Sequence, residues 1–293
     1  MSEGTEPAPI RQIREAKQQG DEEELRQDRT VGRVDLTHWY TRFGQVLATL
    51  VGRIGAVLGA RGALLLTLAV GALIALALSF IASRIYDAVT ESDGVAGLDR
   101  PLLEAALRAR SPVLDLVVTG YTDIAGPVGM PIIAVAAIVI LALKRKSWTP
   151  AILIAAAGMG SLLMTIAGKD IIARDRPPLV DAVPPFEYSP SFPSGHTLNS
   201  VVIAGVVVYL LILRRRSATA RTITIVIGAL FAVTIGLSRV FLGHHWFTDV
   251  LAGWVLGAAW LAIIVTAHRL YLTVRQSPQP TTTQENDVPQ EKA

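Results

Sequence analysis

Residues 197–213 read TLNSVVIAGVVVYLLIL and contain no Asp, Glu, Lys or Arg. A helix needs about 20 mostly apolar residues to cross the hydrocarbon core of a bilayer, and this stretch comes close to that length. One such run could also be a buried helix of a large soluble protein. Further uncharged runs along the same chain argue against that alternative, and they occupy residues 62–83, 124–143, 147–168, 222–238 and 250–267.

The overall composition also differs from that of a soluble domain. Of the 293 residues, 51% are hydrophobic and 17% are charged, and the mean hydropathy is +0.45. An average soluble domain has about 25% charged residues. The sequence therefore predicts an all-α, polytopic membrane protein in which six transmembrane helices form a bundle. The chain has no cysteine, which excludes disulfides and thiolate-bound metals.

Positively charged residues flank the uncharged runs on one predicted side of the membrane. If each run crosses the membrane once, these basic residues all lie on the same side, and cytoplasmic loops carry the excess of Lys and Arg. We therefore expect an integral protein of a plasma membrane with both termini in the cytoplasm. The basic residues are Arg53, Arg61, Lys144, Arg145, Lys146, Arg214, Arg215, Arg216, His268, Arg269 and Arg275.

The segments outside the predicted spans differ in composition. Residues 1–35 are polar and carry charges of both signs, so we expect a disordered or loosely helical cytoplasmic segment. Residues 36–60 place apolar side chains at helical spacing, which predicts an amphipathic helix that lies in the membrane interface or packs against the bundle. The membrane domain is expected to cover residues 61–270, followed by a disordered cytoplasmic tail at residues 271–293.

Two features are predicted for the side of the bundle opposite the basic clusters. The Gly and Pro residues between positions 120 and 131 predict a kink or a break in the second span. Residues 100–110, RPLLEAALRAR, have one apolar face, which predicts a short helix on the outer membrane surface.

Polar side chains that are costly near a bilayer gather in three places, which makes them candidates for function. KDIIARDRPP ends the third run at residues 169–178, PSGH precedes the fourth at 193–196, and SRVFLGHHWFTD joins the fifth to the sixth at 238–249. With the topology above, all three lie at the extracytoplasmic ends of their helices. We therefore expect one active site at that face, with its core within residues 165–255.

Lys169, Arg176 and Arg239 bring three cations to this face. The planar fork of arginine and the point charge of lysine both suit phosphate oxygens. Asp170 and Asp175 could instead neutralise the cations in structural ion pairs. Taken alone, this cluster is equally compatible with a phosphate site and with structural pairs.

The tetrapeptide PSGH is typical of an anion site at the start of a helix. If Ser194 and Gly195 form the turn before a helix, free backbone N–H groups and the Ser194 hydroxyl point to one spot, where the helix dipole attracts an anion. Gly195 lets a ligand approach the backbone closely, and His196 lies within reach in the first turn. The alternative is an ordinary serine N-cap beside an incidental histidine.

His245 and Asp249 are four positions apart, so we expect them on one helix face within hydrogen-bond range. A carboxylate that accepts from one imidazole nitrogen fixes the tautomer and leaves the other nitrogen free as a nucleophile. His244 faces elsewhere and is interpreted as a structural or rim residue. A metal site is the alternative, but further carboxylate or thiolate ligands are lacking nearby in the sequence, and the cations would repel a metal ion.

Together these groups predict covalent phosphoryl transfer without a metal. One histidine attacks phosphorus, the other protonates the leaving oxygen, and the cations stabilise charge on the equatorial oxygens.

In these residues the sequence resembles the type 2 phosphatidic acid phosphatases, which share their site with vanadium haloperoxidases. The three signatures of that family, K-x6-RP, PSGH and SR-x5-H-x3-D, are complete and in order at residues 169–177, 193–196 and 238–249.

The resemblance covers residues 60–270 and implies a role for each of these side chains. It implies a six-helix membrane bundle with the site at its outer face. His245 would be the phosphohistidine nucleophile, oriented by Asp249, and His196 would be the general acid. No metal and no other cofactor is implied, and the residues that would bind phosphate are Lys169, Arg176, Ser194, Gly195 and Arg239.

The resemblance also implies the class of substrate. Six spans do not fit the soluble haloperoxidase branch, whereas the membrane branch acts on lipid phosphates such as phosphatidic acid, phosphatidylglycerol phosphate and undecaprenyl pyrophosphate. The expected partners are a membrane lipid phosphate and the bilayer, with no nucleic acid and with the oligomeric state left open. Two other functions stay open: a lipid-linked phosphotransferase that uses the same phosphohistidine, and a non-enzymatic lipid or anion transporter.

Overall fold

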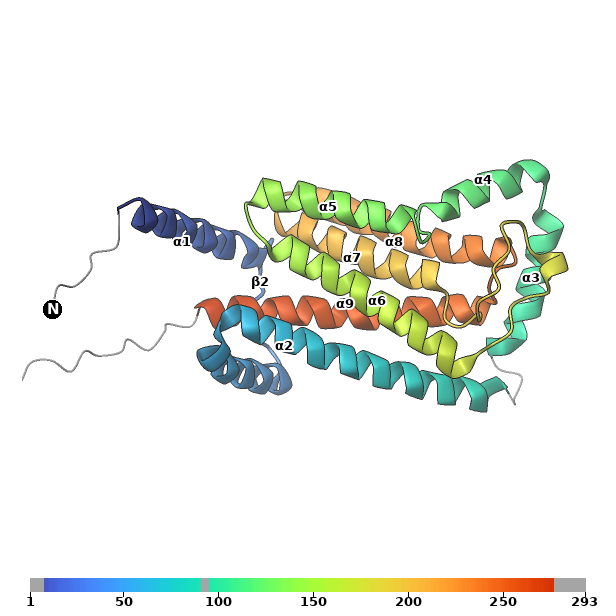
Figure 1. Cartoon of the computed structure of the whole chain (residues 1–293), viewed down its shortest axis with the longest axis horizontal. Coiled ribbons are helices and arrows are strands. Elements are labelled where there is room, and N and C mark those ends of the chain that lie inside the picture. Colours follow the sequence, from blue (N-terminus) through green and yellow to red (C-terminus); the bar gives the residue numbers. More distant parts are fainter. Residues whose placement is uncertain (1–7, 91–94, 277–293) are drawn as a thin grey trace, which may run out of the picture.

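The computed structural model describes residues 8–90 and 95–276, most of which are helical (Figure 1). Long helices run along one common direction, with α3 and α4 at one end and α1 at the other. The elements are α1 (Ala8–Asp28), a hairpin of β1 (Thr30–Val31) and β2 (Val34–Asp35), α2 (Arg42–Thr90), the 3-10 turn η1 (Val95–Leu98), α3 (Asp99–Ala109), α4 (Pro112–Asp123), α5 (Gly129–Arg145), α6 (Thr149–Ile172), the 3-10 turn η2 (Leu179–Asp181), α7 (Gly195–Leu213), α8 (Ala218–Phe241) and α9 (Phe247–Gln276).

Four of the six predicted spans are helices that are long and apolar enough to cross a membrane within the described part of the chain. The predicted run 62–83 lies inside α2, and the run 124–143 overlaps α5, whose 17 residues reach only about 25 Å. The described residues therefore form an all-α bundle in which four helices are both long and apolar enough to span a membrane, whereas the sequence predicts six. These four are Thr149–Ile172, Gly195–Leu213, Ala218–Phe241 and Phe247–Arg275.

The second predicted span begins with a break. α4 ends at Asp123, residues 124–128 form turns and a bend, and α5 begins at Gly129. A Cβ atom at Gly129 would lie 2.4 Å from the carbonyl oxygen of Asp123, so only glycine fits this close approach. The break predicted from the Gly and Pro residues is confirmed, and the helical part of this span is shorter than the uncharged run.

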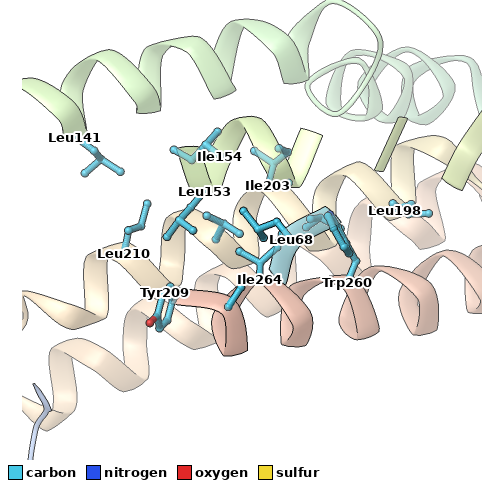
Figure 2. Close-up of a cluster of buried hydrophobic side chains, with 14 of the residues drawn as sticks. Leu68, Leu141, Leu153, Ile154, Leu198, Ile203, Tyr209, Leu210, Trp260 and Ile264 are labelled. Carbon is cyan, nitrogen blue, oxygen red and sulfur yellow. The ribbon is translucent and has the colours of Figure 1, made fainter. Parts of the chain in front are cut away.

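α7 lies at the centre of the bundle and packs against α5, α6, α8 and α9. Its side chains Leu198 and Leu210 are fully buried, as is Ile264 of α9. Figure 2 shows these residues together with Leu153 of α6 and Trp260 of α9. The core thus joins the helices that carry the three polar clusters at their ends.

The outside of the bundle is also apolar. Monomeric soluble proteins rarely expose a contiguous apolar patch larger than a few hundred Å². Here large apolar side chains are exposed along α5, α6 and α8, as is typical of helices surrounded by lipid, and the chain is an integral membrane protein. The exposed residues include Ile132, Val135, Val139 and Ile140 on α5, Met159, Leu162 and Ile166 on α6, and Ile223, Ile227 and Leu230 on α8.

Residues 8–35 form defined elements where the sequence predicts a disordered or loosely helical segment. Asp28, the last residue of α1, is fully buried. Its carboxylate accepts hydrogen bonds from Arg145 Nη1 at 3.0 Å and from Arg214 Nε at 2.9 Å, so α1 is tied to the C-terminal ends of α5 and α7. Disorder is predicted from the sequence because residues 1–35 contain few apolar side chains. Composition alone does not show that Asp28 forms ion pairs with arginines far along the chain. Residues 1–7 lie outside the described residues.

Residues 36–60 contain a helix that begins at Arg42 and kinks at Gly59 (φ 73°, ψ 166°). One face of this helix packs against α9, where Val51 and Leu270 are buried together. The packing alternative predicted for this segment is therefore correct for one face. The other face is apolar and exposed, with Phe43, Val46, Leu50, Val57 and Leu58.

The membrane domain extends beyond the predicted boundary at residue 270. α9 continues to Gln276, and Tyr271 and Leu272 are buried in the core. Thr273 Oγ1 accepts a hydrogen bond from Trp39 Nε1 at 3.1 Å. A disordered tail is therefore the wrong prediction for residues 271–276, because packing continues past the last uncharged run. The rest of the predicted tail lies outside the described residues.

Replacing Asp28 by Asn removes the charge that holds Arg145 and Arg214. Because removing one partner of a buried ion pair leaves the other charge uncompensated, we expect a loss of about 3 kcal/mol and a clearly lower Tm in detergent micelles. The control is Glu23→Gln, whose carboxylate forms an exposed pair with Arg26 and should contribute less than about 1 kcal/mol. Equal Tm values for the two variants would show that α1 does not stabilise the bundle.

Candidate active site

The three polar clusters meet at one end of the bundle, beside α3 and α4 (Figure 1). α6 ends and α7 begins there, and the turn between α8 and α9 closes the same end. α6 approaches the PSGH segment so closely that a Cβ atom at Gly168 would lie 2.4 Å from Cδ of Pro193. The convergence predicted from the sequence is therefore confirmed.

A cavity of about 1020 Å³ opens at this end. Ser194 and Asp249 are fully buried and do not line it, whereas His245 does and is in contact with Arg176. The charged and titratable groups of all three clusters therefore surround one space. The predicted site residues that line the cavity are Lys169, Gly195, His196, Arg239 and His245.

The same cavity has an apolar arm between α5, α6 and α7. Val135, Met159 and Leu162 line this arm and are also 59%, 72% and 60% exposed at the bundle surface. The arm therefore opens on the lipid-facing side of the bundle, between α5 and α6. Its deeper walls include Met130, Ala134, Ile138, Ile154 and Ile203.

His245 lies in the turn between α8 and α9 and is 2% exposed. Its Nε2 is 3.3 Å from Arg176 Nη1, and since arginine can only donate, Nε2 must be the unprotonated nitrogen. Nδ1 then carries the proton of the neutral ring and faces Ser191 and Asp249. Burial lowers the pKa of His245 well below its ordinary value, and Arg176 and Arg239 lower it further. The ring is therefore neutral at pH 7, with its free lone pair toward the cations.

A serine that no sequence motif indicated, Ser191, links His245 to Asp249. Its Oγ lies 3.3 Å from His245 Nδ1 and donates to Asp249 Oδ2 at 2.5 Å, whereas Nδ1 and Oδ2 are 3.6 Å apart. The pair does not share a helix face as predicted, because α9 begins at Phe247 and His245 belongs to the preceding turn. Asp249 instead caps that turn by accepting from the Trp246 N–H at 2.9 Å.

Arg174 and Asp99 support Asp249 from the side opposite Ser191. Arg174 Nη1 donates to Asp249 Oδ1 at 2.6 Å, and Nη2 donates to Asp99 Oδ2 at 2.8 Å. Asp99 also accepts from the backbone N–H of Thr248 at 2.8 Å and from its hydroxyl at 2.7 Å. The short helix predicted at residues 100–110 is confirmed as α3 and supports the site through Asp99. Arg174 stands within the quoted cluster, but nothing in the sequence indicated Asp99.

Arg176 and Arg239 share the carboxylate of Glu187. Arg176 Nη2 lies 2.8 Å from Glu187 Oε2, and Arg239 Nη2 donates to Oε1. Glu187 belongs to the loop between η2 and α7, and it lines the cavity. The cations do have an acidic partner, therefore, but it is Glu187 instead of Asp170 or Asp175. The sequence motifs did not indicate Glu187, because it stands outside all three of them.

The loop that carries Glu187 is attached to the site on both sides. Lys169 Nζ donates to Ser189 Oγ at 3.0 Å and to the carbonyl oxygen of Pro190. His244 Nε2 lies 2.6 Å from the carbonyl oxygen of Val183, to which only a protonated nitrogen can donate. The structural role predicted for His244 is consistent with this bond, although His244 also lines the cavity.

α7 begins at Gly195 with Ser194 as its N-cap, so the helix start predicted from PSGH is confirmed. The Ser194 N–H donates to the carbonyl oxygen of Asp249 at 3.1 Å, and its hydroxyl accepts from Thr197 at 2.9 Å. The Ser194 N–H is therefore not free for an anion. The N–H groups of Gly195 and the following turn have no partner within the helix and lie beside the cavity.

Several polar atoms at this end are buried without a hydrogen-bond partner in the described part of the chain. They are Thr165 Oγ1, Arg239 Nε and His244 Nδ1, and all three residues line the cavity. Buried polar groups are usually paired, so these atoms are suited to a bound ligand. Within residues 8–90 and 95–276, no group of three His, Asp or Glu side chains is placed to hold a metal ion.

The fold and the site define an integral membrane protein with cationic side chains and a neutral histidine around one cavity. The sequence profile of the PAP2 superfamily matches residues 148–271. Phosphatidylglycerophosphatase B of Bacillus subtilis (strain 168) is 34% identical over 181 residues, which are 61% of this chain and 87% of that protein. The chain therefore belongs to the PAP2 superfamily, the type 2 phosphatidic acid phosphatases, and is a phosphatase.

Two further comparisons agree with this family. A crystal structure described as a transmembrane PAP2 type phosphatidylglycerolphosphate phosphatase from Bacillus subtilis matches with a TM-score of 0.58 and 28% identity, covering 64% of this chain and 93% of that chain. Undecaprenyl-diphosphatase of Sulfolobus acidocaldarius is 39% identical over 80 residues, which are 27% of this chain and 33% of that protein. One of these relatives is thus named for a lipid phosphate and another for a lipid diphosphate.

Replacing Ser191 by Ala breaks the link between His245 and Asp249 while leaving Asp249 paired with Arg174. We expect kcat to fall by about tenfold to hundredfold, less than the roughly 10⁴-fold loss known for removal of an orienting carboxylate. KM should change little, because Ser191 does not line the cavity. The control Ser217→Ala removes the N-cap hydroxyl of α8 at the other end of the bundle and should leave kcat unchanged. A rise in KM without loss of kcat would contradict the positioning role.

Proposed function

We propose that this protein is a metal-independent lipid phosphate phosphatase that acts through a phosphohistidine at His245. The observation that carries the proposal is the position of the unprotonated Nε2 of His245 beside Arg176, at the polar end of a cavity with an apolar arm. Lys169 and Arg239 line the same polar end. A nucleophile, an anion site and room for an alkyl chain thus share one space.

In the proposed reaction, Nε2 of His245 attacks phosphorus, so that an N–P bond forms and the bond from phosphorus to the leaving oxygen breaks. Arg176, Arg239 and Lys169 stabilise the charge on the phosphate oxygens. His196 gives a proton to the leaving oxygen. His196 lines the same cavity, at the break between α4 and α5. A Cβ atom added to Gly126 in this break would lie 3.2 Å from Nε2 of His196.

The second half of the reaction regenerates the enzyme. Water loses a proton to His196 and attacks phosphorus, so that a P–O bond forms and the N–P bond breaks. Inorganic phosphate leaves, and His245 returns to its neutral form. Asp249 and Ser191 hold the His245 ring in the required tautomer during both steps.

The proposed substrate is a lipid with a phosphate or diphosphate headgroup, of the phosphatidic acid, phosphatidylglycerol phosphate or undecaprenyl pyrophosphate class. The names of the relatives from Bacillus subtilis and Sulfolobus acidocaldarius support this class, since one names a phosphatidylglycerophosphate and the other a lipid diphosphate. The apolar arm supports it independently, because it opens on the lipid-facing side of the bundle beside Met159 and Leu162.

We also propose that α2 and α5 cross the membrane together with α6, α7, α8 and α9, and that the site faces away from the cytoplasm. The basic residues at the C-terminal ends of α5 and α7, such as Arg145 and Arg216, lie at the end of the bundle opposite the site. Cytoplasmic loops carry the excess of Lys and Arg, so both termini would be cytoplasmic. The exposed apolar face of residues 42–58 would then lie in the cytoplasmic interface.

His245→Ala removes the proposed nucleophile, so we expect phosphate release from a panel of lipid phosphates in detergent micelles to fall by at least about 10³-fold. The wild-type protein should keep its activity in EDTA. A brief incubation with lipid carrying labelled phosphate should leave label on the wild-type protein and not on His245→Ala. The matched control is His38→Ala, an exposed histidine at the opposite end of the bundle.

The other outcomes of this experiment have distinct meanings. Full activity of His245→Ala would refute the nucleophile, and loss of activity in EDTA would refute metal independence. A phosphorylated acceptor in place of free phosphate would identify a phosphotransferase. Substrate flux that survives in a variant lacking both His245 and His196 would identify a transporter.

The proposed orientation can be tested because the chain has no cysteine. Val180→Cys places a thiol on the loop beside the site, where Val180 is 91% exposed, and Arg216→Cys places one at the opposite end. In intact cells, a membrane-impermeant maleimide should label Val180→Cys, whereas Arg216→Cys should be labelled only after permeabilisation. The reverse pattern would place the site in the cytoplasm.

A further inference from the structure

Glu187 occupies the position that the proposed function assigns to the substrate phosphate. Its carboxylate bridges Arg176 and Arg239 and lies 3.9 Å from His244 Nδ1. Glu187 also lines the cavity together with His245. A carboxylate and a phosphate use the same guanidinium donors, so a substrate cannot bind Arg176 and Arg239 until Glu187 has left them.

The loop around Glu187 is built so that this side chain can leave. Glu187 is the inward-facing residue between Phe186 and Tyr188, which are 44% and 81% exposed. The loop is attached on one side through the carbonyl oxygen of Val183. On the other side, the carbonyl oxygens of Ser189 and Pro190 accept from Arg176 and Lys169. Glu187 lies between these attachments, so a rotation of its side chain can release the arginines while the attachments persist.

The carboxylate of Glu187 does not use all the donors of the site. Arg239 Nε and Thr165 Oγ1 have no hydrogen-bond partner in the described part of the chain, although both residues line the cavity. A carboxylate offers two oxygens, whereas a phosphate ester offers three that are not esterified. The site is therefore better matched to a phosphate than to its present occupant.

Glu187 carries a negative charge at neutral pH. Burial alone would raise its pKa, but the adjacent Arg239 and Arg176 more than offset this effect and lower the pKa to about 2. The carboxylate therefore remains an anion at neutral pH.

We propose that Glu187 is a built-in substitute for phosphate that makes the site selective for lipid phosphates over free phosphate and water-soluble phosphate esters. The inference rests on the proposed function, because it takes Arg176 and Arg239 as the phosphate-binding groups. Every oxyanion must displace Glu187, which reduces its apparent affinity. A lipid phosphate still fills the site, because its chain confines it to the membrane and gives its headgroup a high local concentration beside the arm, whereas inorganic phosphate has no chain that concentrates it.

The test compares Glu187→Gln, which keeps the shape and removes the charge, with Glu187→Asp, whose shorter side chain cannot bridge both arginines. Orthovanadate and inorganic phosphate serve as probes, with binding measured directly by calorimetry in detergent. Hydrolysis of a soluble aryl phosphate is measured beside that of a lipid phosphate. The matched control is Glu104→Gln, an exposed glutamate on α3.

Glu187→Gln should bind vanadate and phosphate at least about tenfold more tightly than the wild-type protein. Its hydrolysis of the soluble ester below saturation should rise by a similar factor, while the rate at saturating lipid phosphate should not rise. Glu187→Asp should lie between the two, and Glu104→Gln should match the wild type. Unchanged or weaker oxyanion binding in Glu187→Gln would refute the inference and show that Glu187 only positions the arginines. Tighter oxyanion binding without any lipid hydrolysis would refute the proposed function while supporting competition by Glu187.

Discussion

The buried carboxylate of Asp249 is the group on which the geometry of the site depends. Its side chain accepts hydrogen bonds from Arg174, Ser191 and the backbone of Trp246, and its carbonyl oxygen accepts from the Ser194 N–H. A buried charge is costly unless it is paired and hydrogen-bonded, so these partners must reach Asp249 for the bundle to close. Three motifs that are far apart in the sequence are thereby brought to one point, and the nucleophile and the phosphate site assemble with the fold.

The opposite end of the bundle is held in a similar way. Asp28 is buried between Arg145 and Arg214 and connects α1 to the ends of α5 and α7. Helices in a bilayer gain little from burying apolar side chains against one another, because lipid is as apolar as the core. Polar pairs at the two ends can therefore select one arrangement of the helices in a way that the apolar contacts between them do not.

The helices and the motif residues could be predicted from the sequence for two different reasons. A bilayer excludes charge over about 20 residues, which marks each span directly. The helix ends were less certain, at Gly129 and Gln276 for example, because tight turns and packing determine where a helix stops. His245 and Asp249 were predicted as a pair, but from a helix geometry that the turn before α9 does not have. Ser191, Asp99 and Glu187 could not be predicted, because only tertiary contacts bring them to the site.

The apolar arm between α5 and α6 has a consequence for how such an enzyme would encounter its substrate. Its mouth lies among exposed side chains of these two helices, such as Val135 and Met159, and not at the water-facing end alone. A lipid could then enter sideways, keep its tail in the bilayer throughout, and leave as an alcohol into the same leaflet. The search would be confined to two dimensions, and turnover would follow the mole fraction of the lipid in the membrane instead of its bulk concentration.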